Sequence, residues 1–174
     1  KIRAIGVCNV TLEELKANCA YGEVASDQFR YSMLYRDPER DILPFCEQQG
    51  ISTLTYMSLE QGLLTGKVGM ERAFKPDEFR SNRDWNAWFQ LPNRRRVLDM
   101  LANWKDLTAK YGASLAQLVI AWTAAQPGAT HVLCGIRNRA QLRDNLGAAR
   151  IALEPEDMAR IRRDVVALGE PARS

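Results

Sequence analysis

The sequence has little histidine, no regular cysteine spacing, no long apolar run and almost no excess of charge. Its one histidine and four cysteines, Cys8, Cys19, Cys46 and Cys134, match neither a zinc motif nor a CxxC redox pair, so we expect no metal site. Free thiols indicate a cytoplasmic location. No apolar run approaches the roughly 18 residues of a membrane span, so we expect no membrane partner. The 24 Lys and Arg exceed the 21 Asp and Glu by only 3 and are scattered, which argues against nucleic acid.

What remains is the composition of a globular domain. The 174 residues are 46% hydrophobic and 26% charged, which predicts one domain over residues 1–174 with a core of its own. The first residues, Lys1 to Val7, are typical of a strand and not of a signal peptide. Because the sequence lacks an initiator Met and begins inside this strand, we expect a processed N-terminus or part of a longer chain.

Short apolar runs alternate with helical patterns along the chain. Strands are predicted at residues 2–7, 24–29, 51–56 and 130–134. Four helix starts are predicted from local signals, namely the Thr11-Leu-Glu-Glu14 capping box, Asp37-Pro38, Asn138 and Pro155. Strands that alternate with helices form parallel sheets through right-handed crossovers. The sequence therefore predicts an α/β fold of four parallel strands with flanking helices.

One long segment, residues 62–93, has no regular pattern. Loops of this length in a compact domain are usually functional or mobile. Its aromatic residues Trp85, Trp88 and Phe89 are typical of side chains that anchor a loop to the core. The following Arg94-Arg-Arg96 is expected to lie on a solvated helix face.

Polar or glycine-rich residues follow three of the predicted strands, at Gly6–Asn9, Tyr56–Gly62 and Cys134–Asn138. Ligands bind at the carboxyl ends of parallel strands. The third segment runs through Gly135 into a helix start, where free N–H groups and Arg137 would favour an anion such as phosphate. Taken alone, each segment is equally compatible with an ordinary turn.

Four ordered motifs together resemble the aldo-keto reductase family. They are Ile2-Arg-Ala-Ile-Gly-Val-Cys-Asn9, Leu54-Thr-Tyr-Met-Ser-Leu-Glu-Gln-Gly-Leu-Leu-Thr-Gly-Lys67, Phe79-Arg-Ser81 and Gly135-Ile-Arg-Asn-Arg-Ala-Gln-Leu-Arg-Asp-Asn145. The match covers only the C-terminal half of the domain that defines the family. It implies half of a (β/α)8 TIM barrel, whose mouth holds NADP(H).

The resemblance also implies a role for each matched residue at the nicotinamide end of the cofactor. Asn9 and Gln28 would bond the carboxamide, with Cys8 beside them, and Tyr56 would stack on the ring. For the other end it implies that Leu59, Gly62, Leu64 and Lys67 surround the diphosphate, mostly through backbone N–H groups. Gly135, Arg137 and Gln141 would line the adenosine and 2′-phosphate pocket, and Asp144 and Asn145 would meet the adenine edge; Arg80 is a further phosphate candidate.

Three positions depart from the family pattern. Cys8 replaces a Ser, and Met57 and Ser58 stand where the family has Ser-Pro, so hydrogen bonds to the cofactor are weakened. The family's catalytic Tyr, Lys, His and Asp would precede this sequence, so we assign no catalytic residue. We expect an oxidoreductase half that reduces aldehydes or ketones only in a complete barrel, formed as a homodimer or with an N-terminal half. The alternative is a non-enzymatic module that self-associates and keeps a vestigial nucleotide pocket.

Overall fold

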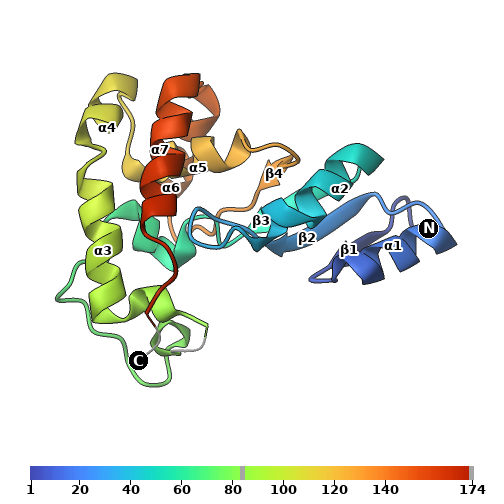
Figure 1. The fold of residues 1–174 in the computed structure, drawn as a ribbon, viewed down its shortest axis with the longest axis horizontal. Helices are drawn as coiled ribbons and strands as arrows, with labels where there is room; N and C mark the ends of the chain where they lie inside the picture. The colour runs from blue at the N-terminus through green and yellow to red at the C-terminus, as the bar shows by residue number, and fades with distance from the viewer. Residues whose placement is uncertain (83–84, 173–174) are drawn as a thin grey trace. The chain divides into compact units, whose positions relative to one another are not determined.

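The computed structural model describes residues 1–82 and 85–172, which form two compact units (Figure 1). Unit 1 comprises residues 1–58 and 122–137, and unit 2 comprises residues 59–121 and those from 138 onward. The prediction of one domain over residues 1–174 is not tested by this division and stays a prediction. Residues 83 and 84 of the long segment 62–93 lie outside the described residues.

A parallel four-stranded sheet forms unit 1, in the order β1-β2-β3-β4. The strands are β1 Gly6–Cys8, β2 Ser26–Arg30, β3 Ser52–Tyr56 and β4 His131–Val132. Each strand pairs with the next along the chain, and every pair is parallel, as the alternation of strands and helices predicts. β1 begins later than predicted because its partner begins at Ser26, which is in register with Gly6.

Helix α1, Leu12–Tyr21, begins at the predicted capping box. The Glu14 N–H donates to Thr11 Oγ1 at 3.2 Å, and the Thr11 N–H donates to Glu14 Oε2 at 2.8 Å. Both groups would otherwise be unsatisfied at a helix start, so the box fixes where α1 begins.

Helix α2, Ile42–Gln49, begins later than predicted. Asp37-Pro38 opens a short 3-10 helix, Asp37–Arg40, and Asp41 caps α2 by accepting from the Ile42 N–H at 2.6 Å. The Pro favours a tight turn but the chain needs a second cap before it continues as a regular helix. Gly50 ends α2 with a φ of 67°, a left-handed conformation that suits glycine.

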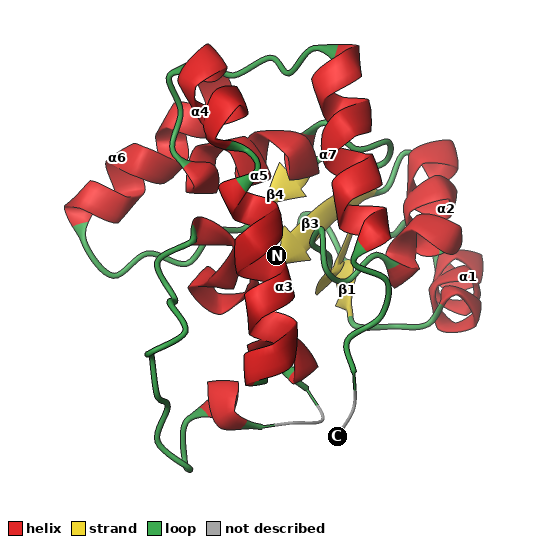
Figure 2. Ribbon diagram, turned by 60° about the vertical axis from the view of Figure 1, so that its left-hand side comes forward, coloured by secondary structure: helices red, strands yellow, loops and turns green. Residues whose placement is uncertain are grey.

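Helices α1 and α2 lie side by side against the sheet of unit 1 (Figure 2). Leu15 of α1 and Cys46 of α2 are fully buried with Val24 and Ile51, which precede strands β2 and β3. A second cluster joins Phe29, Tyr31 and Leu43. These clusters place the helix-facing side of the sheet in the core.

Within unit 1, the turn before β4 packs closely on strand β3. The Thr130 N–H donates to Thr53 Oγ1 at 2.9 Å, and the Thr53 N–H donates to Thr130 Oγ1 at 2.7 Å. Thr53 Oγ1 donates in turn to the Gly128 carbonyl at 2.7 Å. Gly128 has a φ of 77°, and a Cβ there would lie 2.6 Å from the Leu43 carbonyl oxygen. The position therefore requires glycine for both conformation and space.

Unit 2 is helical. Its helices are α3 Leu91–Ala102, α4 Lys105–Tyr111, α6 Arg139–Gly147 and α7 Pro155–Ala167, with α5 Leu115–Ala124 continuing into unit 1. Short 3-10 helices lie at Glu60–Thr65, Phe79–Ser81, Ala87–Phe89 and Ala148–Arg150. The predicted starts at Asn138 and Pro155 are confirmed.

Helices α3, α4 and α7 pack together through a polar and an apolar set of contacts (Figure 1). Trp104, fully buried between α3 and α4, donates from Nε1 to Asp164 of α7 at 2.8 Å. Lys110 Nζ donates to Asp157 at 2.7 Å, and this bond raises the pKa of Lys110 above its usual range. Ile161 and Val165 supply the apolar face of α7.

The first turns of α3 hold the C-terminal tail. Asn93 is 1% exposed; its Nδ2 donates to the Ala172 carbonyl at 2.8 Å, and its Oδ1 accepts from the Ala172 N–H at 2.9 Å. Arg96 donates to the Glu170 carbonyl at 3.2 Å and to the Leu168 carbonyl. The prediction of a solvated face at Arg94-Arg-Arg96 is therefore wrong for Arg96, because the tail supplies carbonyl acceptors.

The predicted fold class is confirmed: four parallel strands in sequential order, with flanking helices, in the pattern of half a (β/α)8 barrel. Across residues 1–82 and 85–172, we find no helix with the length and apolar character that crossing a bilayer requires. All four cysteines are free, Cys46 buried and Cys8 exposed among them.

Candidate functional site

Residues from three strands meet at the carboxyl edge of the sheet in unit 1. Cys8 ends β1 in register with Gln28 of β2. The Asn9 N–H donates to the Gln28 carbonyl at 2.8 Å, and the Tyr56 hydroxyl donates to Asn9 Oδ1 at 2.8 Å. The structure thus brings together the four residues predicted for the nicotinamide end: two amides, one thiol and one aromatic ring.

The backbone at these strand ends is strained. Asn9 and Met57 have φ values of 54° and 60°, in the left-handed region that non-glycine residues rarely adopt. Such conformations cost of order 1–3 kcal/mol and are frequent at functional sites. Ser58, which follows, is 1% exposed, and its Oγ finds no hydrogen-bond partner among the described residues. A proline at this position, as the family has, would bury no hydroxyl.

The loop Leu59–Lys67 in unit 2 bonds mostly to itself. The N–H groups of Gly62 and Leu64 both donate to the Leu59 carbonyl, at 2.9 and 3.3 Å, and the Lys67 N–H donates to Thr65 Oγ1 at 3.2 Å. These N–H groups were predicted to surround a diphosphate, which would have to share or replace the bonds. The exposed Lys67 side chain is the direct source of positive charge here.

A buried asparagine joins this loop to the segment that contains Arg80. Asn86, 3% exposed, accepts from Gln61 Nε2 at 2.5 Å and donates to the Phe79 carbonyl at 2.6 Å. Gln61 itself has a φ of 52°. The two bonds hold the turn after Leu59 and the residue before Arg80 in one arrangement.

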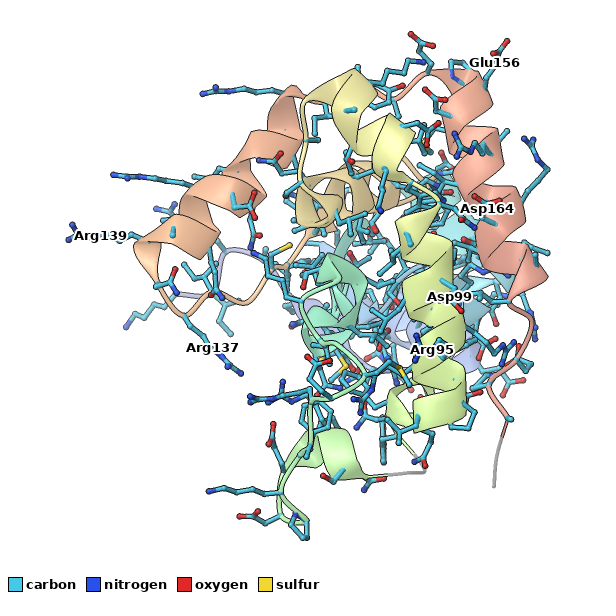
Figure 3. The ribbon with its side chains drawn as sticks, turned by 90° about the vertical axis from the view of Figure 1, so that its left-hand side faces the viewer. Arg95, Asp99, Arg137, Arg139, Glu156 and Asp164 are labelled. Carbon is cyan, nitrogen blue, oxygen red and sulfur yellow. The ribbon has the colours of Figure 1, made fainter. Side chains whose placement is uncertain are left out.

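Arg94 anchors the rest of the long loop. It is 3% exposed; Nη1 donates to the Gly69 and Arg72 carbonyls at 3.1 and 2.7 Å, and Nη2 donates to the Phe89 carbonyl at 2.8 Å. Burial lowers the pKa of this guanidinium. The prediction that Arg94 is solvated is wrong, because loop carbonyls replace its water. Its neighbour Arg95 does lie on the outer surface of α3 (Figure 3).

A cavity of about 590 Å³ opens beside this anchor, lined among others by Phe74, Arg80 and Arg94. The Arg80 and Arg94 guanidinium carbons lie 4.5 and 5.1 Å from the centre of the Phe74 ring. Glu78 pairs with Arg80. Trp88 and Phe89 are buried near α3, as predicted for loop anchors, whereas Trp85 is 59% exposed.

The predicted adenosine residues fall in both units. Gly135 and Arg137 follow β4 in unit 1 and are exposed. Gln141, Asp144 and Asn145 lie on α6 of unit 2, whose first turn is capped by Asn138 through the Gln141 N–H at 2.9 Å. Arg139, beside this cap, points away from the helix (Figure 3).

Asp144 is more firmly held than its neighbours on α6. Its Oδ1 accepts from the Ser114 hydroxyl at 2.8 Å, and its carbonyl accepts from Gln117 Nε2 at 2.9 Å. Sequence reasoning missed Ser114, although Ser114-Leu-Ala-Gln117 has the spacing of a capping box.

A second missed residue is Asp27, which precedes Gln28 on β2. It is fully buried, and neither carboxylate oxygen has a hydrogen-bond partner among the described residues. Its neighbours in register are Val7 and Thr53, and the Thr53 hydroxyl already donates to Gly128. Burial raises the pKa of Asp27 to about 6 and that of Cys46 to about 12.

The model of the aldo/keto reductase family matches residues 1–164 of this chain. The chain therefore belongs to that family, in agreement with its architecture and its strand-end residues. It is 38% identical over 168 residues to the NADH-specific methylglyoxal reductase of Escherichia coli (strain K12), covering 97% of this chain and 50% of the relative. It is also 38% identical to the aldo-keto reductase YhdN of Bacillus subtilis (strain 168), covering 82% and 42%.

Among solved structures, the glycerol dehydrogenase of Gluconobacter oxydans matches with a TM-score of 0.87 and 28% identity, covering 99% of this chain and 51% of that one. The chain therefore spans about half the length of the relatives it matches.

Proposed function

We propose that this chain is the nicotinamide-cofactor-binding part of an aldo-keto reductase that reduces aldehydes or ketones with NADP(H). The observation that carries the proposal is the meeting of Asn9, Gln28 and Tyr56 at one edge of the sheet, with Asn9 bonded to both of the others. The family relationship supports it, and the free cysteines fit the reducing cytoplasm.

The donor set of unit 1 suits a carboxamide beside an aromatic ring. Tyr56 occupies Asn9 Oδ1, so Asn9 Nδ2 remains to donate to an amide oxygen. The half-buried Gln28 side chain has no hydrogen bond within the described chain, so both its oxygen and its nitrogen are available. The Tyr56 hydroxyl is held by Asn9, which limits rotation of the ring that would stack on nicotinamide. When bound, the cofactor supplies the hydride for carbonyl reduction.

For the other end of the cofactor we propose Lys67, Gly62 and the loop around Leu59 and Leu64 for the diphosphate. Gly135, Arg137, Gln141, Asp144 and Asn145 are proposed for the adenosine. An arginine such as Arg137 favours a 2′-phosphate, which is why NADP(H) is proposed. The Escherichia coli relative is named as NADH-specific, so both cofactors belong in the test.

We propose that the chain alone does not reduce carbonyls, because the family's catalytic Tyr, Lys, His and Asp would come from another half-barrel. A second copy or an N-terminal half would cover the outer strands β1 and β4. Ile2 and Ile5, before β1, are 81% and 60% exposed, which supports such a partner. Hydride transfer needs a proton donor beside the carbonyl, and the proposed partner supplies it.

A second candidate is a self-associating module without enzymatic function. The unpaired Ser58 hydroxyl and the strained Met57 favour it, because both weaken the strand end next to Tyr56. In that case the nucleotide pocket is vestigial. Sedimentation would show a stable oligomer, and titration would show no binding of a dinucleotide.

Titration of the purified chain with NADPH and with NADH, followed by nicotinamide fluorescence, tests the proposal. We expect micromolar binding of at least one cofactor, abolished in Y56A and kept in Y21A, whose tyrosine is 95% exposed in the same unit. Absence of binding by either cofactor would reject it in favour of the module. Turnover of an aldehyde panel above background would contradict the proposed inactivity of the isolated chain.

A further inference from the structure

The C-terminal tail, residues 168–172, is held by the side chain of one asparagine. The tail runs beside the first turns of α3 in unit 2, where Asn93 meets Ala172 (Figure 1). Asn93 Nδ2 donates to the carbonyls of Ala172 and Ala87, at 2.8 and 2.9 Å. Asn93 Oδ1 accepts from the Ala172 N–H at 2.9 Å and from Arg96 Nη1 at 3.1 Å. Because an amide side chain has two donor hydrogens and two acceptor lone pairs, Asn93 uses its full capacity here.

The hydrogen bonds that hold the tail go to its backbone. Asn93 binds the N–H and the carbonyl of Ala172, and Arg96 donates to the carbonyls of Glu170 and Leu168. The side chains of Glu170 and Ala172 are exposed. A change that removes a backbone N–H should therefore release the tail, whereas a change in an exposed side chain should leave it in place.

The same asparagine connects the tail to the loop that contains Gln61. The Ala87 carbonyl, which accepts from Asn93 Nδ2, belongs to the residue directly after Asn86. Asn86 is 3% exposed, and its Oδ1 accepts from Gln61 Nε2 at 2.5 Å. Three hydrogen-bonded links thus lead from Ala172 to Gln61, and all of them lie within unit 2.

The turn at the far end of this path depends on support from outside the loop. Glu60 and Gln61, in the loop Leu59–Lys67, have φ values of 43° and 52°. Non-glycine residues keep such conformations only where the surrounding structure holds them. The bond from Gln61 to the buried Asn86 is one such support, so a shift of Asn86 would let the turn relax.

We infer that Asn93 is a positioning residue: by binding the tail, it holds the loop Leu59–Lys67 in the conformation that receives the diphosphate, so that release of the tail weakens dinucleotide binding. The inference rests on the proposed cofactor-binding function and adds control of that site by the C-terminal segment. Asn93 acts through Asn86 and does not touch the cofactor. It orders the loop before the ligand arrives, which lowers the entropy lost on binding.

The test releases the tail in three ways and keeps it in two. A chain that stops after Leu168 lacks the bonds between the tail and Asn93, and N93A removes the side chain that makes them. A172P removes only the N–H that Asn93 Oδ1 accepts, because proline has no backbone N–H. The controls A172S and E170A change exposed side chains and keep the backbone groups. Circular dichroism checks that each form is folded.

Two measurements are made on each form. The first is the rate of trypsin cleavage after Lys67, which is exposed in the loop, compared with cleavage after Lys16, which is exposed on α1 of unit 1. This measurement needs no cofactor. The second is the dissociation constant for NADPH or NADH, whichever the wild type binds more tightly, from nicotinamide fluorescence.

We expect the three releasing variants to be cleaved after Lys67 about tenfold faster than the wild type and to bind the dinucleotide about five- to tenfold more weakly. Losses of this size correspond to one or two hydrogen bonds. Cleavage after Lys16 should not change, because unit 1 is not involved. A172S and E170A should match the wild type in both measurements.

Unchanged cleavage after Lys67 in the shortened chain and in A172P would overturn the inference and leave the proposed function standing. Faster cleavage with an unchanged dissociation constant would do the same. If the shortened chain or N93A is also cleaved faster after Lys16, that variant is unfolding as a whole, and A172P against A172S decides by the same two measurements. Wild-type protein that binds neither cofactor overturns the proposed function and this inference together.

Discussion

The hydroxyl of Tyr56 donates to Oδ1 of Asn9 at 2.8 Å, linking the ends of β3 and β1 across the intervening strand β2. The bond fixes the orientation of the Asn9 amide. It occupies Oδ1, so Asn9 Nδ2 remains to donate to an amide oxygen. It ties the first described strand to a residue 47 positions later, so the strand-end set forms only after three strands have assembled.

Replacement of Tyr56 by Phe removes this bond but keeps the ring. We expect nicotinamide cofactor binding to weaken about fivefold, because a lost neutral hydrogen bond is worth about 1 kcal/mol. The change should be seen in fluorescence titration, with Y21F as the control at an exposed tyrosine. Unchanged affinity in Y56F would show that the orientation of Asn9 does not matter for binding.

Replacement of Arg94 by Met should destabilise unit 2 by roughly 3 kcal/mol, because the carbonyls of Gly69, Arg72 and Phe89 lose a charged donor that is itself buried. R94K should recover only part of the lost stability, since one ammonium group cannot donate to three carbonyls with the geometry of the planar guanidinium. R95M is the matched control and should change stability by less than about 0.5 kcal/mol. Urea unfolding measures all three, and equal effects of R94M and R95M would contradict the anchor.

The buried carboxyl of Asp27 should make the stability depend on pH. Its pKa in the folded chain is about 6, above the ordinary value of 3.8, so the folded state binds the proton more tightly. The contribution of Asp27 to the free energy of unfolding is therefore at its maximum below pH 4. It falls by up to about 1.4 kcal/mol per pH unit as the pH rises to 6, and it stays at the lower value above pH 6. Cys46 keeps its proton throughout this range, since burial raises its pKa to about 12.

The variant D27N should therefore flatten this slope. Urea midpoints of wild type and D27N, measured between pH 4 and pH 7, should diverge as the pH rises, with D27N gaining relative to wild type. D37N, at a carboxylate 66% exposed beside Arg40, is the control and should run parallel to wild type. Parallel curves for D27N would mean that Asp27 finds a partner in solution.

Gly128 should tolerate alanine much less than Gly50. Both have positive φ, 77° and 67°, which costs a Cβ about 1 kcal/mol. Only at Gly128 would the Cβ also approach the Leu43 carbonyl, to 2.6 Å, which adds roughly 1–3 kcal/mol of overpacking. Thermal unfolding of G128A and G50A gives the comparison, and similar losses would indicate that the turn moves away from α2.

Local signals in the sequence predicted four parallel strands and most helix starts, but not the order of the strands in the sheet. The Thr11 box and the Asn138 cap involve residues three apart, so they can be read without knowing the fold. The meeting of Asn9 and Tyr56 also followed, because parallel strands align their carboxyl ends, whereas Gln28 was named through the family resemblance. The cofactor roles of these and the other matched residues stay predictions.

What the sequence could not predict depends on contacts from distant loops. Arg94 lies in a run of arginines typical of a helix surface, and the carbonyls that bury it belong to irregular segments 22 and 25 residues earlier. The helix start at Asp41 was missed because Asp37-Pro38 gives the stronger local signal. Nothing in a strand such as Ser26–Arg30 marks a carboxyl that will lack a partner.

The bonds between Asn93 and Ala172 have a consequence for how the protein is made. They join residues 79 positions apart, so α3 leaves the ribosome long before its partner segment is synthesised. During translation the amide of Asn93 and the guanidinium of Arg96 lack these partners until residues 168–172 have left the exit tunnel. A nascent chain arrested before residue 168 would expose this face of α3 to chaperones and proteases.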